Sequence, residues 1–233
     1  MGFPETTAGV LSVLGGAPDR DLRPAVEALC RRYWKPVFGY VRIAWSKSNE
    51  DAKDLTQAFF LWLIEDDILR RYQPERGSLR GFLKTLLRRF VGHQERALES
   101  LKRGGGKRTI SLEGGPPDMG GLTSDPSSAD PERIFEQVWV EGLVRDAVER
   151  VRGRYAGEGK EAKFRAYEEF VLRPGPDQPS YDDVAAKLGV ERADVERYLF
   201  AIRSEIRAEI RAGLAQTATP EELDVEWKRL FGE

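Results

Sequence analysis

Residues 104–131 are the feature that most restricts how this chain can fold. They contain 7 glycines and 4 prolines in 28 positions. Their few apolar anchors are Ile110, Leu112, Met119 and Leu122. Because a segment so poor in apolar surface cannot bury enough of it to fold alone, we expect a linker. The chain on either side of it must then fold as two separate parts.

On both sides of this linker, apolar side chains recur with the period of an α-helix, and no stretch alternates as a half-buried strand would. Before the linker, the pattern predicts helices over about 21–45, 49–69 and 78–101. Pro36 is expected to end or kink the first of them near Trp34. Ser48 or Asn49 can cap the second helix and Ser78 the third.

After the linker, the same pattern predicts helices over about 131–151, 160–172, 180–188 and from 193 onward, and a short amphipathic helix over 221–231 that packs back on the second domain. The sequence therefore predicts an all-α chain of two small helical domains. The expected divisions are an N-terminal segment 1–20, a first domain 21–103, the linker 104–131, a second domain 132–219 and a tail 220–233.

Charge is distributed unevenly along the chain. The whole protein carries a formal net charge of −2, yet residues 70–108 hold 12 of its 37 Lys and Arg and only 3 of its 39 Asp and Glu. The flanks are acidic, with 8 basic and 10 acidic side chains in 1–69, and 17 and 26 in 109–233. A strongly basic segment between acidic flanks predicts a polyanionic partner for that segment.

Within this basic segment, Arg80, Lys84 and Arg88 recur every four residues, so they share one face of the predicted helix and can follow a phosphate backbone. Polar groups further along the helix could bond to an unpaired base. The residues expected to bind DNA here are Arg80, Lys84, Arg88, Arg89, His93, Gln94 and Arg96.

Residues 180–211 fit a helix-turn-helix, the motif that places its second helix in the DNA major groove. Ala185 supplies the small contact between the helices and Gly189 the turn. The residues expected to face DNA are Arg192, Arg197, Tyr198 and Arg203. Since Asp194 and Glu196 would repel phosphates, we expect a modest intrinsic affinity. The alternative is an ordinary helical hairpin.

Three segments together resemble the extracytoplasmic-function sigma factors of bacterial RNA polymerase. Residues 51–60, DAKDLTQAFF, resemble the helix by which such factors bind the polymerase clamp. Residues 72–83, YQPERGSLRGFL, resemble the loop and helix start that read the −10 element. The helix-turn-helix resembles the domain that reads the −35 element. The resemblance covers roughly residues 20–215.

This resemblance implies a cytoplasmic sigma factor, with no catalytic step and no cofactor, that binds core RNA polymerase and promoter DNA and helps to open the duplex. The polymerase contacts that it implies are Asp51, Asp54, Leu55, Gln57 and Phe60. Lys53 and Ala58 stand where the family usually has an acid, which is expected to weaken docking. Control by an anti-sigma factor, by a kinase or by the C-terminal tail stays open.

Thr56 lies between Lys53 and Ala58, and it is a candidate for phosphorylation. A phosphate there would add negative charge and strengthen docking on a basic clamp surface. The alternative is that Thr56 is an ordinary residue of the helix surface.

The sequence gives no sign of an enzyme or of a metal site. The glycines at 104–106 lead to Lys107 and Arg108, which is not a P-loop, and no nucleophile elbow or paired His and Cys occurs. The single histidine has no ligand partners at metal-binding spacing. Cys30 is the only cysteine in the sequence, so no intramolecular disulfide can form, and we expect Cys30 to be a buried hydrophobe. No run reaches the length of a membrane span and no signal peptide is expected.

A stand-alone helix-turn-helix regulator that acts without polymerase is the alternative reading of the chain. Such a regulator would need neither the helix at 51–60 nor the basic segment that follows it. Its DNA-binding domain should also be the basic one, whereas here the helix-turn-helix lies in an acidic flank.

Overall fold

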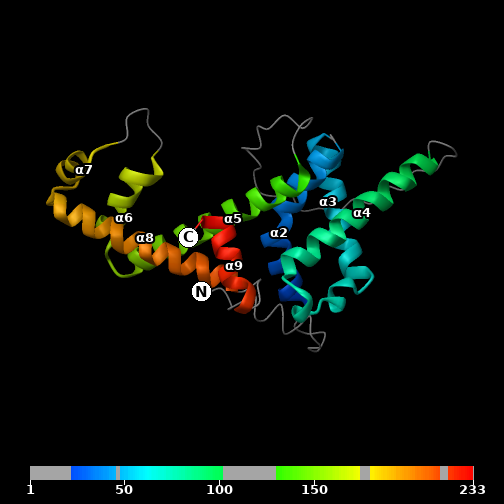
Figure 1. Ribbon diagram of the computed structural model, residues 1–233. Helices are drawn as coiled ribbons and strands as arrows, with labels where there is room; N and C mark the ends of the chain where they lie inside the picture. Colours follow the sequence, from blue (N-terminus) through cyan, green and yellow to red (C-terminus); the bar gives the residue numbers. More distant parts are fainter. Residues whose placement is uncertain (1–21, 46–47, 102–129, 174–178, 216–219, 233) are drawn as a thin grey trace. The chain divides into compact units, whose positions relative to one another are not determined.

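The computed structural model describes residues 22–45, 48–101, 130–173, 179–215 and 220–232, and these residues form helices and no strand (Figure 1). The predicted all-α fold is confirmed for this part of the chain. Two compact units result: residues 1–141 with 216–233, and residues 142–215. This division differs from the expected one, since the start of the helix after residue 130 and the C-terminal tail both fall in the first unit. Residues 102–129, which hold nearly all of the expected linker, lie outside the described part.

The first unit is built on α2 (Leu22–Trp45), α3 (Asn49–Glu65) and α4 (Leu79–Leu101), with short 3-10 turns η2 (Ile68–Arg71) and η3 (Pro74–Arg76) between the last two. The predicted caps are confirmed. Ser48 Oγ accepts the N–H of Asp51 at 3.2 Å, and Ser78 Oγ accepts the N–H of Gly81 at 3.2 Å. Each bond satisfies an N–H group that the first turn of a helix leaves without a partner.

The prediction that Pro36 ends the first helix near Trp34 is wrong. Helix α2 continues through Pro36 to Trp45. The side chains around it, Tyr33, Val37, Phe38 and Val41, are all almost completely buried. An internal proline costs about 3 kcal/mol, whereas burying one large apolar side chain contributes about 1.5–3 kcal/mol. Packing on both sides of the proline therefore outweighs the lost backbone hydrogen bond.

An aromatic cluster fixes α4 against α3. The ring of Phe59 meets that of Phe90 edge-on at 5.5 Å between centroids, and Trp62 lies 5.6 Å from the same Phe90 ring. The buried stripe of α4 continues through Leu79, Leu83 and Leu87, none of which is exposed. The stripe determines which residues of α4 face away from the core.

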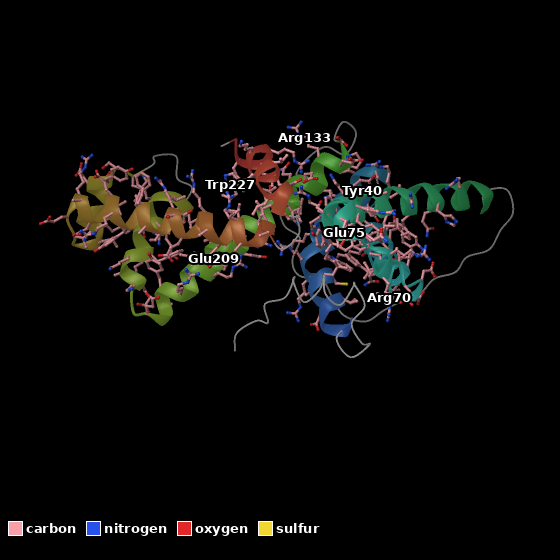
Figure 2. The ribbon with its side chains drawn as sticks, turned by 60° about the horizontal axis from the view of Figure 1, so that its bottom comes forward. Tyr40, Arg70, Glu75, Arg133, Glu209 and Trp227 are labelled. Carbon is pink, nitrogen blue, oxygen red and sulfur yellow. The ribbon has the colours of Figure 1, made fainter. Side chains whose placement is uncertain are left out.

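Two further elements complete the first unit. Helix α5 (Pro131–Gly157) contributes its first turns, in which Phe135 is fully buried and stacks on Tyr33 at 6.3 Å. Helix α9 (Pro220–Phe231), which carries Trp227 in Figure 2, belongs to the same unit. The expectation that this tail packs on the second domain is therefore not met.

The second unit contains the rest of α5 with α6 (Glu161–Tyr167), the π-helix η4 (Glu168–Leu172), α7 (Tyr181–Leu188) and α8 (Arg192–Ala215). Its core stripe on α8 is Val195, Leu199, Ile202 and Ile206. Ion pairs tie α5 to α8: Arg150 Nε lies 2.8 Å from Glu209, which Figure 2 labels, and Arg154 Nη1 lies 3.0 Å from Glu205. None of the described helices is both long and apolar enough to cross a membrane.

Candidate nucleic-acid interface

Arg80, Lys84 and Arg88 do lie along one face of α4, as their spacing predicts, and we call them the basic row. The helix is continuous from Leu79 to Leu101, so residues four apart are neighbours on its surface. Two of these three side chains do not face open solvent, however. The exposed fraction of the Arg80 side chain is only 3% and that of Lys84 is 18%, while Arg88 is 61% exposed.

Three carboxylates meet the basic row, and we call Glu132, Glu136 and Glu226 the acidic cover. Glu132 Oε1 forms an ion pair with Arg88 Nη2 at 2.6 Å, and Glu136 Oε1 accepts from Lys84 Nζ at 2.5 Å. Glu226 accepts from Arg80 Nη2. The first two belong to the first turns of α5 and the third to α9, so three helices meet at this one surface.

Arg80 lies at the centre of this arrangement. Its Nη1 is 3.2 Å from Glu136 Oε2, and its guanidinium stands 4.4 Å from the centroid of the Trp139 ring. Two carboxylates and an aromatic face thus compensate a charge that has left water. The compensation is incomplete, because Nη1 has no partner with hydrogen-bond geometry among the described residues. Arg229 lies 3.4 Å from both Glu136 and Glu226 and reduces the repulsion between them.

A second set of predicted residues on α4 is exposed. Arg89, His93 and Arg96 lie at spacings of four and three, and we call them the open row. At 100° per residue, Arg89 stands about half a turn around the helix from Arg80. No ion pair within the described side chains involves the open row, although Arg96 Nε donates to the carbonyl of Gly92 at 3.0 Å. Gln94 is half-buried.

The loop before α4 is fastened from within. Tyr72 is buried, and its hydroxyl donates to the carbonyl of Gly77 at 3.1 Å. Its ring lies 5.4 Å from that of Phe82. Gly77 has a φ of 125°, a conformation that side chains with a Cβ rarely adopt. Tyr72 thus holds the loop in place.

Only some of the residues predicted to contact polymerase are accessible on helix α3. Asp51 and Asp54 are exposed, and Leu55 and Gln57 are half-buried. Phe60 lies in the core, where it stacks on Trp34 at 5.8 Å. It is therefore a packing residue in this conformation, because a partner cannot reach its ring.

Thr56 is also inside. Its side chain is completely buried, and Oγ1 donates to the carbonyl of Ala52 at 2.7 Å. Neither expectation for this residue, as a phosphorylation site or as a surface residue, matches that environment, because the hydroxyl faces the core. A kinase could reach it only after α3 had moved from its neighbours.

In the second unit, α7 and α8 are joined by three residues. Ser180 and Asp183 form a capping box at the start of α7: the N–H of Asp183 donates to Ser180 Oγ at 3.1 Å and the N–H of Ser180 to Asp183 Oδ2 at 2.8 Å. The hydrogen bonds from the Ser180 hydroxyl and backbone lower the pKa of the Asp183 carboxyl. Gly189 ends α7 with a φ of 66°, which is the left-handed cap that favours glycine.

The predicted DNA-facing residues of α8 are held by neighbours on their own surface. Arg192 lies 3.2 Å from Asp182 and 3.1 Å from Glu196, and Arg197 pairs with Asp194. Arg203 stands over the Phe170 ring at 6.0 Å, and Lys163 lies 5.5 Å from the Tyr198 ring. These are exposed contacts, which contribute about 0–1 kcal/mol each and exchange readily for other partners.

Sequence reasoning missed the most exposed large apolar residue of the chain's described part. Phe200 is 78% exposed. It lies opposite the buried stripe of α8, on an outer face that it shares with Ala193, Arg197, Ser204 and Arg207. The sequence alone could have predicted this exposure, because helical spacing places Phe200 away from the apolar stripe of Val195, Leu199 and Ile202. Glu196, four residues before Phe200, also lies on this face, so the face combines an apolar ring and arginines with one carboxylate.

Comparison of the chain with protein-family models, with curated proteins and with solved structures finds no match. The functional argument therefore depends on the chain's own residues. Within its described part, no group of three His, Cys, Asp or Glu side chains is placed to hold a metal ion.

Proposed function

We propose that this chain is a sigma-type subunit that binds core RNA polymerase, contacts the −10 and −35 elements of a promoter and helps to open the duplex, with no catalytic step of its own. The observation that carries the proposal is the presence of an exposed basic helical face in each of two units. On α4 this face is the open row, and on α8 it is the outer face around Phe200. A protein that reads two separated DNA elements needs two such faces.

The chemistry of the two faces differs in a way that suits this division of work. The outer face of α8 combines arginine with an aromatic ring on the second helix of a two-helix motif, and this second helix is the one that enters the major groove. The open row of α4 combines two arginines with a histidine, groups that bind phosphate and stack on bases.

Docking on polymerase is assigned to α3. Asp51 and Asp54 are exposed on its first two turns, and Leu55 adds a half-buried apolar group beside them. An acidic surface with an apolar neighbour fits a basic protein partner, and it cannot bind DNA. The second candidate function is a regulator that acts alone. Only the α7–α8 pair favours it, and it gives no role to the acidic surface of α3.

The experiment measures two steps separately. Core RNA polymerase is captured with the wild-type chain, with Asp51→Lys/Asp54→Lys and with Asp146→Lys/Glu149→Lys, a control of equal charge change in the second unit. Promoter opening is then measured by permanganate reactivity of unpaired thymines on a promoter library. We expect the α3 variant to lose polymerase binding and the control to retain it.

Arg89→Ala/Arg96→Ala provides the matching test on α4. It should retain polymerase binding and lose promoter opening. Failure of the wild-type chain to bind polymerase, together with tight binding to a specific duplex by the free chain, would instead identify a stand-alone regulator.

A further inference from the structure

We propose that the acidic cover is an intramolecular mimic of a nucleic-acid backbone, which occupies the basic row of α4 until DNA displaces it. This inference rests on the proposed function, because it concerns the regulation of the same α4 helix. It adds a second DNA-binding surface, of which the free chain conceals Arg80 and Lys84. The occupant of the row after displacement is a DNA strand, bound through its phosphates.

The first argument is the register of the charges. Glu132 and Glu136 lie four residues apart on α5, and they meet Arg88 and Lys84, which lie four residues apart on α4. Groups four apart on a helix stand about 5–6 Å from one another, a separation of the same order as that between successive phosphates of a strand. Glu226 extends the line of negative charge to Arg80. The cover thus presents a row of anions to a row of cations.

The second argument is that carboxylate and phosphate compete for the same donors. Arginine and lysine bind both by charge-assisted hydrogen bonds. Arg80 is the one charged side chain that is buried among the described residues, yet its Nη1 lacks a hydrogen-bond partner there. A phosphate oxygen could satisfy this group, so the row retains binding capacity that the cover does not use.

The third argument is that part of the cover is weakly attached. No described apolar side chain of α9 is buried: Leu223, Trp227, Leu230 and Phe231 are half-buried, and Val225 is 66% exposed. A helix that buries so little apolar surface opens at low free-energy cost. The contact of Glu226 with Arg80 is therefore the part of the cover that a polyanion can displace first.

Displacement has a defined consequence for the row. Without Glu226, Arg80 retains Glu136 as its one carboxylate partner among the described residues, and Glu136 is shared with Lys84. Departure of α9 also removes Arg229 from Glu136. The equilibrium between covered and uncovered chains then reduces the apparent affinity for DNA in proportion to the uncovered fraction.

The test compares full-length variants of equal charge change. Glu226→Lys repels Arg80 and uncovers the row, whereas Glu141→Lys changes an exposed residue of α5 whose side chain accepts from Gln137. Binding of a fluorescent thymidine oligonucleotide is followed by anisotropy over a range of salt. Glu226→Lys should bind at least about fivefold more tightly than Glu141→Lys, with a salt slope steeper by roughly 0.7 for each cation uncovered, the value for a single strand. Glu226→Gln should give a smaller gain in the same direction.

Two further measurements distinguish displacement of the acidic cover from a direct attraction of the added lysine to DNA. Adding Lys84→Ala to Glu226→Lys should cancel most of the gain. Hydrogen exchange of residues 220–231 should be faster in Glu226→Lys, and in the wild-type chain it should become faster when the oligonucleotide binds. Equal affinities for Glu226→Lys and Glu141→Lys, or continued protection of α9 in the complex, would overturn the cover and leave the proposed function intact. If no variant binds DNA, with or without core polymerase, both proposals are overturned.

Discussion

Arg80 of α4 forms an ion pair with Glu226 of α9, 146 positions further along the chain. The pair lies over the ring of Trp139, which belongs to a third helix. A charged group taken out of water destabilises a fold unless it is paired. The burial of Arg80 therefore makes the stability of the first unit depend on residues that lie far apart in the sequence.

Replacing Arg80 should show this dependence directly. Arg80→Ala removes the buried cation that pairs with Glu136 and Glu226 and leaves them the exposed Arg229, so we expect a loss on the order of 3 kcal/mol in the free energy of unfolding. Arg31→Ala removes an exposed pair with Glu27 and should cost less than about 0.5 kcal/mol. Urea denaturation followed by circular dichroism measures both. Similar small losses for the two variants would show that the Arg80 pair contributes little.

The features that the sequence predicted correctly depend on local interactions. The predicted caps Ser48 and Ser78 each bond within three residues, and the helices that they begin follow apolar periodicity. Pro36 was misjudged because its cost is local while the packing that offsets it comes from other helices. Local patterns therefore predicted where helices start better than they predicted whether a helix continues.

The burial of functional side chains was harder to predict. Spacing placed Arg80, Lys84 and Arg88 on one face correctly, but nothing near them in the sequence indicates carboxylates that arrive from α5 and α9. Thr56 is a different case. It continues the buried stripe formed by Ala52, Phe59 and Leu63, so its position in the helix predicts burial. Its polar side chain suggested a surface position instead. A hydroxyl that can donate to the preceding turn is readily buried in a helix.

Gly189 and Gly153 form a matched pair for testing backbone strain. A Cβ at either position would meet no atom within 4 Å, so only conformation distinguishes them. Gly189 has a φ of 66°, and Gly189→Ala should cost about 1–2 kcal/mol. Gly153 lies inside α5, where Gly153→Ala should stabilise by roughly 0.5–1 kcal/mol. Thermal and urea unfolding of both variants test the prediction. The changes in the free energy of unfolding must have opposite signs in the two variants.

Ser180→Ala should weaken the start of α7. Removing a serine cap costs about 1 kcal/mol, measured by urea denaturation at neutral pH. The pKa of Asp183 is lowered in the folded chain by the Ser180 hydroxyl and then by its backbone N–H. The stability from this carboxylate is therefore present above its unfolded pKa and is lost as the pH falls through its folded pKa. The loss at acidic pH should be smaller in Ser180→Ala, and an unchanged pH profile would contradict this role of the hydroxyl.

The thiol of Cys30 should react slowly in the folded chain. Burial, and secondarily the carboxylate of Glu27, raise the pKa of this thiol to about 11. Since the thiolate is the reactive form, alkylation by iodoacetamide at neutral pH should be far slower than in urea, with a rate that continues to rise with pH beyond 9. Mass spectrometry of timed samples measures both rates. Equal rates in the folded and unfolded chains would contradict the burial of Cys30.

Phe200→Ala should separate stability from DNA reading. The side chain is 78% exposed, so its removal should change the free energy of unfolding by less than about 0.5 kcal/mol. If the ring contacts a thymine methyl group in the major groove, replacing thymine by uracil should weaken binding of the polymerase-loaded chain by about 0.8 kcal/mol, or roughly fourfold, for each contact. Phe200→Ala should weaken binding to thymine-containing duplex by a similar factor and remove the difference between the two duplexes. Val225→Ala, which truncates another exposed apolar residue, is the control and should retain that difference. A thymine preference that survives in Phe200→Ala would assign the reading of that base to another residue of the outer face of α8.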